Sequence, residues 1–419
     1  MKESRTVEFK REASRSFLKT VSAYANFTSG DILFGIEDNG RVIGIPNPES
    51  LCHDLENVIN DSISPLPRFT LETKAIEGHE IVILHVFEGR DKPYLYKGKA
   101  YRRSNTSDVV VDRLELNRLV LEGQNLSFEE IPSKEQNLTF AVLGEELRNR
   151  ASVEEVDKDV LKTLRLYSKA DGYNNAAAIL ADKNCFNGID VVRFGDDMNE
   201  IRDRERFIGV SALSQLDGAI SLYRRYYQYQ LIEGMTRNTH DRIPEEAFRE
   251  AVANALVHRT WDTPANIQIS MEESRVRITS PGGLPTGISL EEYLNGHVSV
   301  LRNPILGNVF YRLDYIEMFG TGVARIMSAY NESNVKPMFS VTENSITVEL
   351  PALDMSHELT NDEKDVLRCF GENRVLSRTD IQRALGISQA KAGRMLNSLI
   401  SKGRIVKQSA GRATKYRIA

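Results

Sequence analysis

The sequence predicts an α+β protein made of several domains. With 419 residues, the chain has room for two or three domains. A content of 41% hydrophobic and 27% charged residues is typical of globular proteins that bury real cores. Strand-like and helix-like segments follow one another along most of the chain, and the composition becomes strongly basic after Pro351. These observations favour separate α/β domains followed by a basic module.

Composition also excludes some classes of protein. No apolar run is long enough to cross a bilayer, and residues 1–5 are charged where a signal peptide would be apolar. We therefore expect a cytoplasmic protein with no membrane partner. The cysteines Cys52, Cys185 and Cys369 lie far apart without a C-x-x-C pair, which argues against a structural zinc site and against a disulfide framework.

The first 121 residues have the hydrophobic patterns of a small α/β domain. We expect a strand at residues 6–10, a helix at 15–27, a hairpin of 32–36 and 41–45, a helix at 51–63 and a strand at 80–86. Asn39 and Gly40 supply the positive φ angles that a tight hairpin turn needs.

Four short motifs in this region, taken in order, resemble the Schlafen AlbA-type domain over residues 1–121. They are Glu3-Ser4, Glu8-Phe9-Lys10, residues 25–30 and residues 35–40. The resemblance implies a domain that binds nucleic acid, either DNA or RNA. In nucleolytic members, two glutamates and an aspartate bind a divalent metal that activates water, and these places match Glu3, Glu8 and Asp38. The alternative is a charged strand face and an ordinary turn, in a domain that binds nucleic acid without cutting it.

A basic cluster interleaved with tyrosines follows on segments that we expect to be paired strands. Its basic residues are Lys92, Lys97, Lys99, Arg102 and Arg103, and its tyrosines are Tyr94, Tyr96 and Tyr101. Positive charge attracts phosphates, and aromatic rings stack on bases. The cluster therefore predicts contact with nucleic acid, and a solvated pair of strands is the alternative.

Residues 122–170 read as a helical connector, and a new α/β unit begins near residue 171. Helix signals occur at residues 144–150 and 153–166, and segments 176–180 and 189–194 start the new unit. A long helix is expected at residues 211–233. It carries Tyr223, Tyr226, Tyr227 and Tyr229 at a spacing typical of a packing face.

A predicted helix at residues 250–258 carries three polar side chains at a spacing of four. Glu250, Asn254 and His258 share one stripe, because each step of four residues rotates by only about 40°. Burying a carboxylate, an amide and an imidazole is costly unless they have partners. The stripe predicts a functional site, and the wet face of an amphipathic helix is the alternative.

Two glycine-rich turns follow this helix. The first lies at residues 280–287. Its glycines lack side chains, so its backbone can come close to a ligand or to another segment. The second lies at residues 319–326 and opens a helix with Gly320, Thr321 and Gly322. Backbone N–H groups and the positive end of a helix make such a turn a seat for phosphate.

The polar helix, the two glycine turns and the sequence Arg302-Asn303-Pro304 between them resemble the GHKL, or Bergerat-fold, ATPase module over residues 171–351. The resemblance implies an α/β sandwich with helices on one face of a mixed sheet, and ATP with Mg²⁺ or Mn²⁺ as cofactors. Glu250 would be the general base that polarises the attacking water, and Asn254 would hold the metal. The nucleotide-binding positions would be Asn254, His258, Ser280, Gly282, Gly283, Gly320, Thr321 and Gly322.

Three of these positions leave alternatives open. Ser280 stands where typical members carry an aspartate that accepts from the adenine amino group, and a neutral hydroxyl accepts a weaker bond. His258 would either reach a phosphate or have a structural role. Arg302 would contact the nucleotide or a neighbouring subunit.

Residues 352–419 form a basic module. From residue 372 onward there are eleven basic and two acidic residues, although the whole chain has a net charge of -5. Three helices and two short strands, with Gly386 at the turn between two helices, resemble a winged helix-turn-helix. By that resemblance Gln389, Lys391 and Arg394 would face the major groove, and Arg412 the backbone or the minor groove. A winged helix that binds an acidic protein is the alternative.

These features predict an ATP-binding, DNA-binding regulator of transcription whose grip on DNA, or whose assembly, is controlled by a slow ATPase. Modules of the GHKL type often dimerise, so we expect a homo-oligomer. One alternative is a metal-dependent Schlafen-type nuclease gated by nucleotide, with a role in defence. Another is a degenerate GHKL fold that binds no nucleotide and only assembles subunits.

Overall fold

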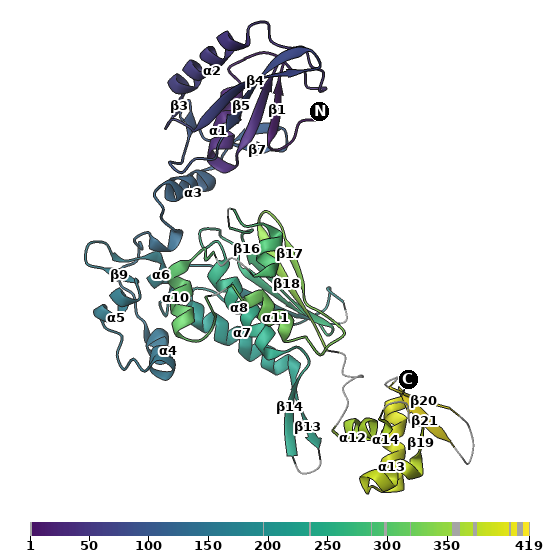
Figure 1. Cartoon of the computed structure of the whole chain (residues 1–419). Coiled ribbons are helices and arrows are strands. Elements are labelled where there is room, and N and C mark those ends of the chain that lie inside the picture. The colour runs from purple at the N-terminus through teal and green to yellow at the C-terminus, as the bar shows by residue number, and fades with distance from the viewer. Residues whose placement is uncertain are drawn as a thin grey trace.

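The structure, a computed structural model, describes residues 2–195, 197–233, 236–285, 287–296, 300–318, 320–353, 361–371, 375–401, 404–408 and 414–418 (Figure 1). It confirms an α+β protein of several domains, because separate sheets and separate apolar cores follow one another along the chain. In this described part of the chain, no helix is both long and apolar enough to cross a membrane.

The N-terminal part is a four-stranded sheet with two helices on one face (Figure 1). Its main elements are β1 (Val7–Lys10), α1 (Phe17–Phe27), β2 (Gly30–Phe34), α2 (Pro48–Ser62), β4 (Phe69–Ile76) and β5 (His79–Val86). The strands lie in the order β1-β2-β5-β4, and only β1 and β2 are parallel. Phe17 and Leu18 of α1 and Leu55 of α2 share one core with Ile32 and Leu84 of the sheet.

The predicted hairpin of residues 32–36 and 41–45 is confirmed only near its turn, where Glu37 N donates to Arg41 O at 3.0 Å and Ile43 N donates to Gly35 O at 2.9 Å. Ile36 and Val42 form an isolated antiparallel bridge, while β2 pairs with β1 on one side and with β5 on the other. Because both edges of β2 are already hydrogen-bonded, residues 41–45 cannot extend along it. Val42 instead joins Phe9 in a small apolar cluster on the second face of the sheet.

Short elements complete the N-terminal part and connect it to the next. They are β3 (Ile63–Ser64), β6 (Leu95–Tyr96), β7 (Tyr101–Ser104), β8 (Ser107–Val110), α3 (Arg113–Gly123), the 3₁₀ turn η1 (Phe128–Glu130), α4 (Ala141–Ala151), α5 (Lys158–Thr163), β9 (Tyr167–Ser168) and β10 (Gly172–Tyr173). A reciprocal capping box of Asp112 and Glu115 begins α3 and fixes where the helix starts.

The middle part is a six-stranded mixed sheet with helices on one face, as predicted (Figure 1). Its strands are β11 (Ile189–Phe194), β12 (Ile201–Phe207), β15 (Ile267–Met271), β16 (Arg275–Pro281), β17 (Met338–Val341) and β18 (Ser345–Pro351), in the order β12-β11-β15-β16-β18-β17. Its helices are α6 (Asn175–Leu180), α7 (Ala212–Tyr227), α8 (Glu245–His258), α9 (Leu290–Asn295), α10 (Pro304–Arg312) and α11 (Gly322–Ser328). Alternate residues of the strands, such as Val191, Ile269 and Ile278, face α7 and α8 and form the largest core.

The long helix predicted at residues 211–233 ends six residues early. Helix α7 stops at Tyr227, and the chain turns into a hairpin of β13 (Gln228–Glu233) and β14 (Thr236–Asp241) that projects from the middle part (Figure 1). The helix ends here because strand pairing with β14 takes over the backbone hydrogen bonds. Tyr223 and Tyr227 are buried and stacked on each other, as expected of a packing face.

The C-terminal part has its own small core and sheet. Its elements are α12 (Asn361–Phe370), β19 (Leu376–Ser377), α13 (Arg378–Leu385), α14 (Gln389–Ser401), β20 (Ile405–Lys407) and β21 (Lys415–Ile418), with strand order β19-β21-β20. Ser377 caps α13, and Gly386 ends it at a φ of 64°, so both predicted helix signals are confirmed. Phe370, Ile381 and Leu396 pack together and join the three helices.

Candidate functional site

Helix α8 carries the predicted polar stripe. Two glutamates in its first turn, Glu245 and Glu246, suit the positive end of the helix. One turn on, Glu250 is only 2% exposed, between the half-buried Arg249 and the core residue Ala251. The amide Nδ2 of Asn254 donates to Glu250 Oε1 at 3.1 Å, so each polar group on the stripe gives the other a partner.

The second glycine turn lies directly against these two side chains. A Cβ atom on Gly322 would lie 2.6 Å from Asn254 Nδ2 and 2.8 Å from Glu250 Oε1. No real Cβ contact is that short, so only glycine allows α11 to begin at this distance from α8. The structure therefore brings Gly322 against Glu250 and Asn254, which lie about 70 residues earlier in the sequence.

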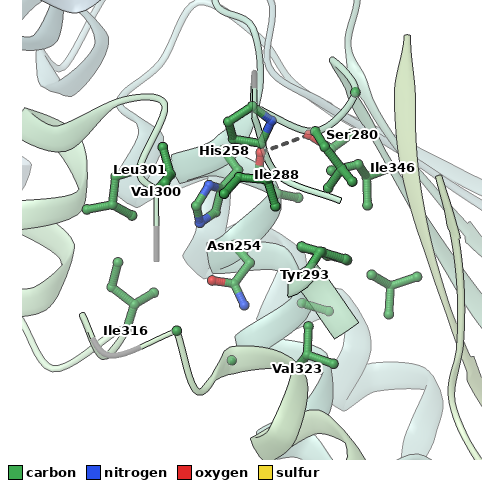
Figure 2. Close-up of a pocket in the computed structure, with 18 of the residues that line it drawn as sticks. Asn254, His258, Ser280, Ile288, Tyr293, Val300, Leu301, Ile316, Val323 and Ile346 are labelled. Atoms are coloured by element: carbon green, nitrogen blue, oxygen red, sulfur yellow. Dashed lines mark hydrogen bonds between the residues drawn. The ribbon is translucent and has the colours of Figure 1, made fainter. Parts of the chain in front are cut away.

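A pocket opens beside this contact, between α8, the sheet and the segments around both glycine turns. Figure 2 shows Asn254 and His258 reaching into it from α8, with Ser280 and Ile346 on the side of the sheet. Of the predicted positions, it is lined by Asn254, His258, Ser280, Gly283, Gly320 and Gly322. Its other walls are mostly apolar and include Ile278, Leu284, Ile288, Tyr293, Ile316 and Val348. Glu250, Gly282 and Thr321 stand behind this lining.

The burial of the stripe changes the acid-base properties of two residues. Desolvation raises the pKa of Glu250, and the Asn254 hydrogen bond and nearby Arg325 oppose this only in part. Burial, with some repulsion from Arg302, lowers the pKa of His258 to about 4. At neutral pH the imidazole is therefore uncharged, and a carboxylate with a raised pKa is a better proton acceptor than an ordinary one.

Ser280 contributes an acceptor to the pocket. Its hydroxyl donates to the carbonyl oxygen of Ala255 on α8 at 3.0 Å (Figure 2). Because that bond uses the only hydroxyl hydrogen, the oxygen can offer a ligand only its lone pairs. The predicted role of Ser280, accepting from the amino group of a base, stays a prediction.

Arg302 holds the first glycine turn in place. Its guanidinium donates to the carbonyl oxygen of Gly283 at 2.9 Å and to that of His258 at 3.3 Å. A Cβ atom on Gly282, whose φ is +104°, would lie 2.2 Å from Arg302 Nη1. Arg302 thus links the turn to the end of α8, and its contact with a ligand or a neighbouring subunit stays a prediction.

A second polar centre lies in the N-terminal part around Glu8. Its carboxylate is buried and pairs with Arg103 at 2.6 Å and with Lys10. Arg103 also pairs with Asp108 at 2.9 Å and is itself buried. Glu8 is therefore already neutralised by two cations.

Comparison with known protein families now assigns two of these parts. Residues 3–112 match the family model described as Schlafen, AlbA_2. Residues 265–350 match the model described as putative ATP-dependent DNA helicase recG C-terminal. The chain carries a Schlafen AlbA_2 domain and an ATPase-like domain of the recG C-terminal type.

Two solved structures are also similar to this chain. The DIP2311 protein from Corynebacterium diphtheriae is 19% identical, with 99% of this chain and 92% of that chain covered and a TM-score of 0.49. The N-terminal domain of a putative ATP-dependent DNA helicase RecG-related protein from Nitrosomonas europaea is 28% identical, with 27% of this chain and 88% of that chain covered and a TM-score of 0.22.

The metal ligands predicted for the AlbA_2 domain do not come together. Glu3 accepts a hydrogen bond from the backbone N–H of Phe9 at 2.9 Å, and Asp38 is exposed in a turn. Within the described ranges, no group of three or more histidine, cysteine, aspartate or glutamate side chains is placed to hold a metal ion. Asp38 thus lies in an exposed turn, as in the alternative interpretation, whereas Glu8 is buried and does not lie on a solvated strand face. The metal-dependent nuclease stays a prediction.

The basic cluster of the AlbA_2 domain is only partly on the surface. Arg103 and Lys92 are buried, and Lys92 pairs with Glu88 and Glu122, so these two predicted contacts are wrong. Tyr94, Tyr96 and Tyr101 belong to the core, because their alternating positions face inward. Lys97 and Lys99 are exposed, and Arg102 is half-buried beside Glu115 at 3.3 Å. These three remain available to phosphates.

A bidentate ion pair joins the helix after the AlbA_2 domain to the ATPase-like part. Arg118 of α3 donates to both carboxylate oxygens of Asp262, at 2.7 and 2.8 Å, and to the hydroxyl of Thr263 at 2.9 Å. Asp262 lies just beyond α8, and Arg118 is close enough to Arg302 to contribute to lowering its pKa. Sequence patterns gave no signal for this link.

On α14 of the C-terminal part, two of the three residues predicted to face DNA are exposed. Gln389 and Arg394 are exposed, whereas Lys391 pairs with Asp362 at 2.6 Å and is half-buried. Arg412 lies outside the described residues. Asn397 was missed by the sequence analysis, although its spacing of three from Arg394 puts both on one face of the helix.

Proposed function

We propose that the protein is a nucleotide-controlled, DNA-binding regulator of transcription. It binds ATP with Mg²⁺ in the pocket between α8, α11 and the first glycine turn, and the nucleotide sets its grip on DNA. The observation that carries this proposal is the contact of buried Glu250 with Asn254 and Gly322, two residues that line the pocket. The family match of residues 265–350 supports it.

The side chains present fit a nucleotide with its metal. Asn254 uses Nδ2 for Glu250, which leaves Oδ1 as an oxygen ligand of the kind that Mg²⁺ prefers. The apolar walls suit the flat face of a base, and Ser280 can accept from its amino group. Bound Mg²⁺ would neutralise phosphate charge and polarise the terminal phosphorus.

Glu250 is the candidate general base. Its raised pKa favours taking a proton from water, and the Asn254 hydrogen bond fixes one carboxylate oxygen and leaves the other for this role. We propose that ATP hydrolysis is slow. Among the described residues, the side chain that hydrogen-bonds to Glu250 is Asn254, an amide, so no second proton acceptor assists the carboxylate.

Nucleic acid binding is proposed for both ends of the chain. In the AlbA_2 domain, Lys97, Lys99 and Arg102 would contact phosphates. In the C-terminal part, which we propose to be a winged helix, Gln389 and Arg394 of α14 would reach base edges in the major groove, with Asn397 one turn from Arg394. DNA is the preferred partner because a basic helix followed by a basic hairpin suits a duplex.

We propose that Arg302 and Arg118 couple nucleotide binding to DNA binding. Arg302 holds the glycine turn that lines the pocket, and Arg118 ties the neighbouring Asp262 to α3, directly after the AlbA_2 domain. A nucleotide that shifts the turn would change both contacts. The AlbA_2 domain would then move relative to the C-terminal part.

Two measurements test the proposal on the full chain. Calorimetry with ATP and Mg²⁺ should detect binding to the wild type. Asn254→Ala should lower the affinity for ATP by about tenfold or more, because the proposed amide ligand of Mg²⁺ is removed. A gel shift with duplex DNA, with and without ATP, should show a difference in affinity. Absence of nucleotide binding would favour a part that only assembles subunits, and homo-oligomer formation can be read from light scattering of the same samples.

A further inference from the structure

The terminal phosphate of a nucleotide needs a cation, and one arginine stands at the edge of the pocket. Arg325 lies on α11, three residues after Gly322, the glycine that abuts Glu250 and Asn254. Its guanidinium pairs with Glu317 at 3.0 Å, and Glu317 itself lines the pocket. Both side chains are partly exposed, 37% for Arg325 and 40% for Glu317.

Arg325 also acts electrostatically on the candidate base. Its positive charge opposes the rise in the pKa of Glu250 that burial causes, while its guanidinium contacts Glu317 directly. An ion pair with this much exposure contributes little to stability and breaks readily. A terminal phosphate carries more charge than a carboxylate and, like a carboxylate, offers two oxygens to the planar guanidinium, so it competes well with Glu317.

We propose that Arg325 recognises the terminal phosphate of the bound nucleotide and that Glu317 holds this arginine while the pocket is empty. This inference rests on the proposed function and deepens it, because it names the side chain that distinguishes a triphosphate from a diphosphate. Exchange of Arg325 from Glu317 to phosphate also frees Glu317 at the rim of the pocket. Glu317 therefore opposes nucleotide binding, and Arg325 favours it.

Calorimetry with three ligands tests the assignment. The wild type, Arg325→Ala, Arg325→Lys and Glu317→Gln are each titrated with adenosine, ADP and ATP in the presence of Mg²⁺. Arg325→Ala should weaken ATP binding by about 10- to 100-fold, the usual cost of losing a charge-assisted hydrogen bond, and leave adenosine binding unchanged. Arg325→Lys should recover part of the loss. Glu317→Gln should strengthen ATP binding, because the competing carboxylate is gone.

The outcomes separate this inference from the function on which it rests. Arg312→Ala, an exposed arginine at the end of α10, serves as the matched control and should bind all three ligands like the wild type. If the wild type prefers ATP to ADP and Arg325→Ala keeps the same preference, the assignment of Arg325 is overturned and nucleotide binding stands. If Arg325→Ala loses adenosine and ATP equally, its role is structural. If the wild type binds none of the three, the proposed function itself fails.

Discussion

Asn254 donates from its amide nitrogen to Glu250 Oε1 at 3.1 Å, one turn apart on α8. The bond fixes the rotamers of both side chains and leaves the amide oxygen of Asn254 and the second oxygen of Glu250 uncommitted. It also satisfies a carboxylate that is almost completely buried, which would otherwise be costly. One hydrogen bond thus positions the candidate metal ligand and the candidate base together.

The first prediction concerns the candidate base. Glu250→Gln should reduce ATP hydrolysis by about 100-fold or more and keep ATP affinity within about threefold, because an amide cannot take a proton from water but has nearly the same shape. Phosphate release and calorimetry measure the two effects. Glu246→Gln changes an exposed glutamate one turn earlier on α8 and should hydrolyse ATP normally. Equal rates for both variants would remove Glu250 from the proposed chemistry.

The second prediction concerns the close approach of α11 to α8. Gly322→Ala should weaken nucleotide binding by about tenfold or more, because its Cβ would collide with Asn254 Nδ2 and Glu250 Oε1 and displace one of them. Gly144→Ala on α4 is the control, since its Cβ would meet only Val156 at an ordinary 3.5 Å. Calorimetry of both variants checks this, and normal binding by Gly322→Ala would contradict the packing described.

The third prediction concerns the link between the AlbA_2 domain and the ATPase-like part. Arg118→Ala should leave ATP affinity unchanged and abolish the difference in DNA affinity between the ATP-bound and ATP-free protein, because the ion pair to Asp262 is lost. Asp262→Asn should do the same. Arg113→Ala changes an exposed arginine on the same helix and should keep the difference. Gel shifts at two ATP concentrations measure this difference in DNA affinity. If ATP changes the DNA affinity of Arg118→Ala as much as that of the wild type, the proposed link through Arg118 is refuted.

The fourth prediction concerns α14. Arg394→Ala should weaken binding to duplex DNA by about tenfold and reduce the slope of affinity against salt concentration by about one, since one cation is removed from the interface. Arg368→Ala on α12 is the control, because that side chain is exposed but pairs with Asp365 at 2.9 Å. Fluorescence anisotropy over a range of salt concentrations gives both quantities. Wild-type affinity for Arg394→Ala would favour a protein partner for this domain.

The fifth prediction concerns pH. Glu129 in η1 is fully buried and accepts from the backbone N–H groups of Ile305 and Leu306, and burial raises its pKa to about 7. Because the folded protein holds this proton more tightly than the unfolded chain, whose carboxyl has a pKa of 4.5, its contribution is greatest below pH 4.5 and is lost as the pH rises to about 7. The loss is roughly 3 kcal/mol at most.

Glu129→Gln should remove this part of the pH dependence. Chemical unfolding of wild type and variant between pH 4.5 and 7.5, followed at the ATPase-like part, measures the difference in the free energy of unfolding. Glu145→Gln, an exposed residue on α4, should behave like the wild type. Parallel pH curves for the wild type and Glu129→Gln would show that the carboxyl titrates normally.

The sequence by itself determined the fold class, the polar stripe and the capping signals. Glu250, Asn254 and His258 lie on one face of α8 because a helix repeats every 3.6 residues, whatever surrounds it. Ser377 and Gly386 bound α13 for equally local reasons, a side-chain cap and a left-handed residue. The winged helix and the cofactors stay predictions from resemblance.

Only the tertiary structure decided which charged residues are free and which are used internally. Arg103 and Lys97 look equivalent in the sequence, yet Arg103 is buried against Glu8 and Lys97 is exposed. Arg302 and Arg118 are also used internally. Arg302 bonds to Gly283, 19 residues away in the sequence, and Arg118 bonds to Asp262, 144 residues away. Pairing across such distances depends on how whole elements pack, and local patterns carry no information about it.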